Sequence, residues 1–274
     1  MNLIMETCFK VLLVGWFIIS ASFAANAQKL PKVQTESVYA PANIKIDGKP
    51  TEWDGKFQAY NVSNHLFYTL SNDDKNLYLI IHTSAVNTIN KIYVGGITFT
   101  VNSLSHLGKL PVSITYPVIR GINNAVYMHA NDTYREYKKD SIANAQNITD
   151  LIHLKNEQFN SIYNELRTSG IKEGDDPFIS VYNTDGIKVR ALFDSNFAYT
   201  YELALPLKYL GQVLDSADKL IFDIKLNGND RGNGRFTPNP PRAFRPDGSE
   251  IINMDNLYVT NPTDFKGQYT LAKR

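Results

Sequence analysis

A glycine-rich stretch at residues 227–235, which reads NGNDRGNGR, has the clearest potential for binding chemistry. It offers donors and acceptors from Asn229, Asp230, Arg231 and Arg235. Glycine lets the backbone approach a ligand, and these side chains pair with hydroxyl or carboxylate groups. The spacing does not fit a calcium-binding EF-hand, because Arg231 stands where an oxygen ligand is required. The stretch predicts a ligand-binding loop, with an ordinary exposed loop as the alternative.

Two tyrosines, Tyr134 and Tyr137, flank Arg135 in a region rich in Asn, Asp and Lys. The C–H faces of sugars pack on aromatic rings, and Tyr is a rigid platform for such contacts. The pair therefore predicts a surface on which a sugar could stack. The alternative is that both rings pack this region onto the rest of the protein.

Three carboxylates, Asp47, Glu52 and Asp54, lie close together in the sequence. Closely spaced oxygen ligands suit Ca²⁺, so these residues are a candidate calcium site, with turn formation as the alternative. Glu202 could serve as a ligand or a base, but its strand-like surroundings favour a solvent-facing or paired carboxylate. Trp53 could stack on a sugar, although a single Trp beside a strand is more often buried in the core.

Patterns typical of catalysis are missing from the sequence. The five histidines show no metal-binding spacing, and there is no nucleophile elbow, phosphate-binding loop or dinucleotide fingerprint. Adjacent acids at 73–74 and 175–176 could form a glycosidase pair, but neighbouring acids on turns are usually solvated. We therefore expect a protein that is not an enzyme, and keep a glycan-active enzyme as a third interpretation.

The first 27 residues have the pattern of a secretory signal peptide. Lys10 precedes the apolar run at residues 11–19, and Ala25-Asn26-Ala27 forms a small-x-small cleavage site. A membrane anchor is the alternative, but the apolar run is shorter than the about 20 residues that span a bilayer. Cleavage would remove Cys8, the only cysteine. We expect a secreted or periplasmic protein without a disulfide and without a transmembrane span.

Alternating hydrophobicity in short segments predicts an antiparallel β-protein. The segments are residues 44–47, 66–70, 77–81, 97–101, 112–116, 179–181, 187–193, 199–205, 220–226, 256–259 and 268–271. The second and third should form a hairpin, with the third near a sheet centre because both its faces are apolar. Asp185-Gly186 predicts a second hairpin between its neighbouring strands. The formal net charge of +1 argues against nucleic acid as a partner.

Helices are expected in two places. Residues 85–93 predict a short helix, and residues 119–176 predict a helical insertion. Within the insertion, Phe159, Ile162, Tyr163 and Leu166 form one apolar stripe, with Asn156 able to cap the start and Gly170 the end. The predicted fold is a single antiparallel β-sandwich over residues 28–274 with this central helical insertion.

Four short motifs resemble the carbohydrate-binding module family 9 group, whose fold is also called DOMON-like. Residues 44–53 read IKIDGKPTEW, similar to the family's opening I-x-I-D-G-x-x-x-E-W. Residues 72–78 (NDDKNLY), 199–207 (YTYELALPL) and 220–235 (LIFDIKLNGNDRGNGR) are similar to its D-D-x-N-L-Y, Y-x-x-E-x-A-I-P and Gly/Asp-rich loop motifs. The order and spacing of the motifs frame most of the chain, apart from the 119–176 region.

The resemblance implies a jelly-roll-like β-sandwich that binds a glycan without catalysis. Well-understood members hold the end of a glycan between two Trp rings and carry structural calcium. Here only Trp53 lies outside the signal peptide, and Gly228 stands where the family tends to have Asp. The leading prediction is therefore a secreted glycan-binding domain. The alternative is a structural or protein-interaction domain of the cell envelope that has lost sugar binding.

Overall fold

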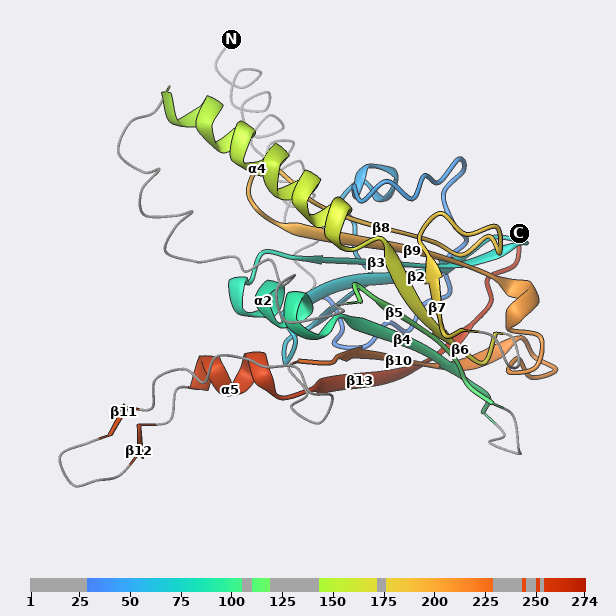
Figure 1. The fold of residues 1–274 in the computed structure, drawn as a ribbon. Coiled ribbons are helices and arrows are strands. Elements are labelled where there is room, and N and C mark those ends of the chain that lie inside the picture. Colours follow the sequence, from blue (N-terminus) through green and yellow to red (C-terminus); the bar gives the residue numbers. More distant parts are fainter. Residues whose placement is uncertain are drawn as a thin grey trace, which may run out of the picture. The chain divides into compact units, whose positions relative to one another are not determined.

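Two antiparallel β-sheets stacked face to face form the body of the structure, a computed structural model (Figure 1). It describes residues 29–104, 110–118, 143–171, 176–228, 243–244, 250–251 and 254–274. The five-stranded sheet has the order β1 (Ala59–Asn61), β2 (Leu66–Asn72), β3 (Asn76–Thr83), β9 (Tyr199–Pro206) and β8 (Lys188–Phe193).

The six-stranded sheet has the order β13 (Thr263–Thr270), β10 (Lys219–Leu226), β4 (Ile97–Asn102), β5 (Val112–Tyr116), β6 (Glu165–Ser169) and β7 (Phe178–Ser180). Two short strands, β11 (Ala243–Phe244) and β12 (Glu250–Ile251), pair with each other outside the sandwich sheets. The structure thus confirms the predicted all-β antiparallel sandwich.

The core lies between the two sheets, because alternate residues of each strand point inward. On β3 the buried inward residues are Leu77, Leu79 and Ile81, and on β10 they include Phe222 and Ile224. The predicted hairpin is β2 and β3, with Tyr68 opposite Ile81. β3 is the central strand of its sheet, as its two apolar faces predict.

In the part of the chain that the structure describes, three α-helices accompany the sheets: α2 (Val86–Gly95), α4 (Ala143–Ile162) and α5 (Met254–Thr260). α2 confirms the helix predicted for residues 85–93. α4 packs against β8 near its C-terminal end, where Phe159 is buried in the core and the Asn156 side chain bonds to the backbone of Phe193. There are also short 3₁₀ turns at η1 (Thr51–Trp53) and η3 (Leu207–Tyr209).

The limits of the predicted central helix were wrong. α4 ends at Ile162, whereas the apolar stripe was expected to continue through Leu166 to a cap at Gly170. Leu166 lies instead in β6, which pairs with β5. Phe159 and Tyr163 do point into the core from the helix end. The edge of β5 has backbone N–H and C=O groups that residues 165–169 can pair with. The hydrogen bonds of this strand pairing stabilise β6 more than the local helical pattern stabilises a helix.

Three strand predictions were also wrong. Residues 44–47 form no strand and belong to neither sheet, and residues 256–259 lie in helix α5. The Asp185-Gly186 turn does not close a hairpin, because β7 belongs to the six-stranded sheet and β8 to the five-stranded sheet. A turn motif sets the local reversal of the chain, but the sheet that each flanking segment joins depends on distant partners.

The predicted signal peptide at residues 1–27 and part of the predicted insertion, residues 119–142, lie outside the described residues. Within the described part of the chain, no helix combines the length and apolar character needed to cross a bilayer.

Candidate functional site

An N-terminal segment, residues 40–57, covers part of the outer face of the five-stranded sheet. Its Ala40 and Trp53 join Tyr78, Ile80 and Ala204 of β3 and β9 in a second apolar cluster. Ile44, Ile46 and Phe57 pack against the same cluster. This explains the alternating Ile residues of the segment, which bury one side without joining the sheet. Trp53 is 7% exposed, so its prediction as a core residue is confirmed.

Glu202, on β9, fastens this covering segment to the sheet. Its Oε2 accepts the backbone N–H of Asp47 at 2.9 Å and of Gly48 at 2.8 Å, and its Oε1 accepts the indole N–H of Trp53 at 3.3 Å. Gly48 has φ +83°, and a Cβ there would lie 2.9 Å from the Leu192 side chain. The turn therefore needs glycine to present its N–H to the carboxylate.

Glu202 is only 1% exposed, so of the two expected environments, solvent-facing or paired, the solvent-facing one was wrong. Burial raises the pKa of Glu202 to about 7, although the hydrogen bonds from Gly48, Trp53 and Asp47 act in the opposite direction. The loss of hydration on burial outweighs the donors. Glu202 thus has a structural role that binds the IDG turn and the Trp to the strand. Two of the four motifs that carry the resemblance, residues 44–53 and 199–207, meet at this carboxylate.

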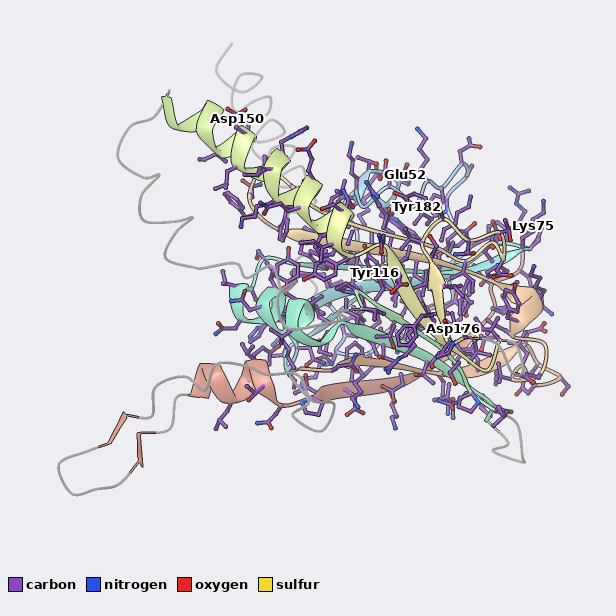
Figure 2. All side chains as sticks on the ribbon, in the orientation of Figure 1. Glu52, Lys75, Tyr116, Asp150, Asp176 and Tyr182 are labelled. Carbon is purple, nitrogen blue, oxygen red and sulfur yellow. The ribbon has the colours of Figure 1, made fainter. Side chains whose placement is uncertain are left out.

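The candidate calcium ligands make separate local contacts. Asp47 Oδ1 accepts the backbone N–H of Lys49, Glu52 accepts the Thr51 hydroxyl, and Asp54 lies 3.7 Å from the Lys56 ammonium. Glu52, labelled in Figure 2, projects from the covering segment. In the described ranges no three His, Cys, Asp or Glu side chains are grouped so that they could hold a metal ion. Calcium at Asp47, Glu52 and Asp54 stays a prediction.

The other predicted ligand-binding residues are Asn229, Asp230, Arg231, Arg235, Tyr134 and Tyr137, and all six lie outside the described residues. The structure does place the start of the predicted loop. The Asn227 side chain donates to the carbonyl of Gly95 at 2.8 Å, which sets the exit of β10 against the end of α2.

A row of partly exposed rings, Phe57, Tyr60, Phe67 and His82, lies on the same outer sheet face at the end of the covering segment. Tyr60, Phe67 and His82 are successive cross-strand partners on β1, β2 and β3. The Tyr60 and Phe67 rings are 4.4 Å apart, and Phe57 stacks on His82 at 5.5 Å. His82 also contacts the Thr200 hydroxyl at 2.9 Å. Burial lowers the pKa of His82, so its ring is neutral at pH 7 and adds to an apolar surface.

A cavity of about 200 Å³ lies at the edge of the six-stranded sheet, beside β6 and β7. Its lining combines an apolar part with hydroxyl and carboxylate groups: Thr168, Ser169, Gly170, Ile171, Asp176, Pro177, Ile179 and Asp185. Asp176 is labelled in Figure 2 beside the ends of these two strands. Small-molecule sites use both kinds of contact, apolar surface and placed polar groups, and this lining offers both.

Several hydrogen bonds hold the walls of this cavity. The Tyr209 hydroxyl donates to the carbonyl of Asp185 at 3.1 Å, and the Gln212 amide donates to the carbonyl of Gly170 at 3.2 Å. Asp176 Oδ1 accepts the backbone N–H of Phe178 at 2.9 Å, which fixes the entry into β7. The lining is therefore positioned before a ligand arrives.

Sequence reasoning did not find this cavity. Asp176 was weighed only as part of an adjacent acid pair, and Asp185 only as a turn residue. The residues that line the cavity come from three separate stretches, and nothing in their local patterns indicates that they meet. The one usable signal was the strong Asp185-Gly186 turn, which marked a fixed loop.

Comparison with protein-family models, with curated proteins and with solved structures gives no match.

Proposed function

We propose that this protein is a secreted, non-catalytic domain that binds a glycan, and that the cavity beside β6 and β7 receives the sugar. The single supporting observation is the composition of that cavity. Carboxylate and hydroxyl oxygens of Asp176, Asp185 and Thr168 are acceptors for sugar hydroxyls, and Ile171 and Ile179 offer an apolar wall to C–H groups.

The size of the cavity narrows the class of glycan. Sites for drug-sized ligands occupy about 300–1,000 Å³, whereas this cavity measures about 200 Å³. It has room for one small ring and not for a run of several sugars. We therefore infer that the domain recognises the end or a side branch of a glycan. Recognition of a glycan end is also what the sequence resemblance implies.

The test is a glycan array with the purified protein, followed by titration calorimetry of the best ligand. Asp176→Asn and Asp185→Asn keep the side-chain shape, and an Asn at 176 can still accept the Phe178 N–H. Loss of a hydrogen bond from a sugar hydroxyl to a charged acceptor costs about 1.5–3 kcal/mol, so each variant should bind about 10- to 100-fold more weakly.

Glu157→Gln is the matched control, because Glu157 is an exposed carboxylate on α4 that contacts only His153 among the described ion pairs. It should bind like the parent protein. Binding unchanged in both Asp variants would show that the sugar sits elsewhere, and an array without any signal would refute glycan binding. Running the array with calcium and with a chelator tests the calcium prediction. Analysis of the glycans after incubation with the protein tests whether the protein cleaves them.

A second function is favoured by the ring row at Phe57, Tyr60, Phe67 and His82. Partly exposed aromatic side chains grouped on one face are typical of protein-interaction surfaces. This supports the alternative of a cell-envelope interaction domain. If the array gives no signal, cross-linking in the native cell tests this second function. Phe67→Ser should reduce the amount of envelope protein that is cross-linked to the domain. Lys75→Ser, at an exposed turn, should leave that amount unchanged.

Export through the N-terminal segment is part of the proposal. Fractionation of cells that express the full chain, with mass spectrometry of the N-terminus, should find a mature protein that begins at Gln28. A cytoplasmic protein with an intact N-terminus would contradict it.

A further inference from the structure

A buried polar cluster joins helices α2 and α5 to the start of β13. It consists of Lys91 on α2, Tyr258 on α5, Thr263 on β13, Asn64 in the turn between β1 and β2, and Thr88 on α2. Lys91 and Thr88 are 0% exposed and Asn64 is 1% exposed. These residues are separate from both the sugar cavity and the ring row.

Lys91 is a buried cation without a described counter-charge. Its ammonium donates to the Thr263 hydroxyl at 2.8 Å and lies 4.3 Å from the centre of the Tyr258 ring. None of the carboxylate side chains that the structure describes forms an ion pair with it. A buried ammonium is strongly unfavourable unless a negative partner is near, and a hydroxyl and a ring supply only part of that stabilisation.

Asn64 is linked to the ammonium through the Thr263 hydroxyl. Thr263, which accepts from Lys91, in turn donates its hydroxyl hydrogen to Asn64 Oδ1. The other end of the same amide, Asn64 Nδ2, is buried and has no hydrogen-bond partner among the described residues. A buried donor without an acceptor costs about 1–3 kcal/mol.

The cluster has more N–H groups than the described hydrogen bonds satisfy. The ammonium has three N–H groups and the amide has two. Among the side-chain acceptors, Thr263 Oγ and Asn64 Oδ1 are already used, and the hydroxyl oxygens of Thr88 and Tyr258 face each other at 2.9 Å. The carbonyl of Asn64 is also occupied, because it receives the hydroxyls of Thr88 and Tyr258. The site thus has positive charge and N–H groups for which the described residues show no acceptor.

We propose that this cluster binds a small monovalent anion, a halide or a single carboxylate group, held between Lys91 Nζ and Asn64 Nδ2. The anion would accept the free N–H groups and neutralise the buried charge. Burial alone lowers the pKa of Lys91 to about 8, so the ammonium is mostly protonated at pH 7 and able to attract an anion. The anion would have a structural role, tying α2 to α5 and β13.

The test measures thermal unfolding at pH 7 as chloride, bromide or acetate replaces sulfate at constant ionic strength. A ligand at 100 times its Kd stabilises the native state by about 2.7 kcal/mol, which corresponds to a rise in Tm of about 5 °C. We expect that rise in the parent protein. A response to halides alone identifies a halide site, and a response that includes acetate identifies a carboxylate site.

Three variants separate the site from general salt effects. Lys91→Met removes the charge and should lose the anion-dependent rise, whereas Lys266→Met, an exposed lysine 3.4 Å from Asp223, should keep it. Asn64→Asp keeps the acceptor for Thr263 and supplies a built-in carboxylate, so it should unfold at a Tm that no longer depends on the anion. This variant decides the question if Lys91→Met does not fold.

A crystal soaked in bromide gives a direct readout. An anomalous peak within hydrogen-bonding distance of Lys91 Nζ and Asn64 Nδ2 would support the proposal. Equal anion responses in the parent, Lys91→Met and Asn64→Asp proteins, or a bromide-soaked crystal without a peak at this position, would overturn it. Neither result depends on whether the protein binds a glycan.

Discussion

Replacing Glu202 with alanine should lower the free energy of unfolding by about 4 kcal/mol, as measured by urea denaturation at pH 6. The change leaves the N–H groups of Asp47, Gly48 and Trp53 without their acceptor. Each buried group that loses its partner costs about 1–3 kcal/mol. The covering segment would also lose its tie to β9, so Trp53 fluorescence should shift towards that of an exposed indole before global unfolding.

Glu202→Gln tests whether both oxygen acceptors of the side chain are needed or one is enough. The amide oxygen can still accept from Asp47 and Gly48, but the amide N–H₂ then faces the indole N–H of Trp53, which is also a donor. We expect a loss of about 2 kcal/mol. A Glu202→Gln protein as unstable as Glu202→Ala would mean that the two hydrogen bonds from the backbone of Asp47 and Gly48 do not hold the segment.

The same pair of proteins should reveal a pH dependence. The pKa of Glu202 is raised from an ordinary 4.5 to about 7 in the folded protein. The folded state therefore holds this proton more tightly than the unfolded state. The corresponding stability is complete below pH 4.5 and is lost as the pH rises through 7. The change is at most about 3 kcal/mol, at 1.36 kcal/mol for each pH unit between the two pKa values.

Other groups titrate in the same range, so the difference between parent and Glu202→Gln is the quantity to measure. His82, whose pKa is lowered, is present in both proteins and cancels in the difference. We expect the stability advantage of the parent over Glu202→Gln to shrink between pH 5 and pH 8. An advantage that grows with pH would show that the three N–H donors outweigh burial and that the carboxylate is ionised throughout.

Gly95→Ala is the second change for which we expect a large effect, a loss of about 3 kcal/mol in the free energy of unfolding. A Cβ at position 95 would lie 2.5 Å from the backbone nitrogen of Gly228 and closer still to its carbonyl oxygen. Both are backbone atoms, so relief requires the end of α2 and the exit of β10 to separate. The hydrogen bond from the Asn227 amide to the Gly95 carbonyl would be strained at the same time.

Gly211→Ala is the control for this prediction. No atom lies within 4 Å of a Cβ at position 211, and its φ is not positive. This substitution should be neutral or stabilise the protein slightly, because it reduces the freedom of the unfolded chain. Denaturant unfolding compares the two variants directly. Similar stabilities for Gly95→Ala and Gly211→Ala would contradict the close packing of α2 against the exit of β10.

Local pattern was enough to predict many elements of the fold. Alternating hydrophobicity located β2, β3, β4, β5, β9 and β10, because one face of each strand must be buried whatever its neighbours are. The apolar character of β3 on both faces also predicted its central position. The burial of Trp53 followed from its size and its place beside a turn. These features depend on residues that are close in the sequence.

Tertiary structure alone decided where ambiguous segments belong and which polar groups meet. Residues 165–169 became β6 because β5 had a free edge, and residues 256–259 became part of α5. Glu202 is buried because a turn 154 residues earlier supplies its donors, and Lys91 meets Thr263 across 172 residues. Such contacts depend on sheet order and on packing between distant segments, and neither can be predicted from the local spacing of residues.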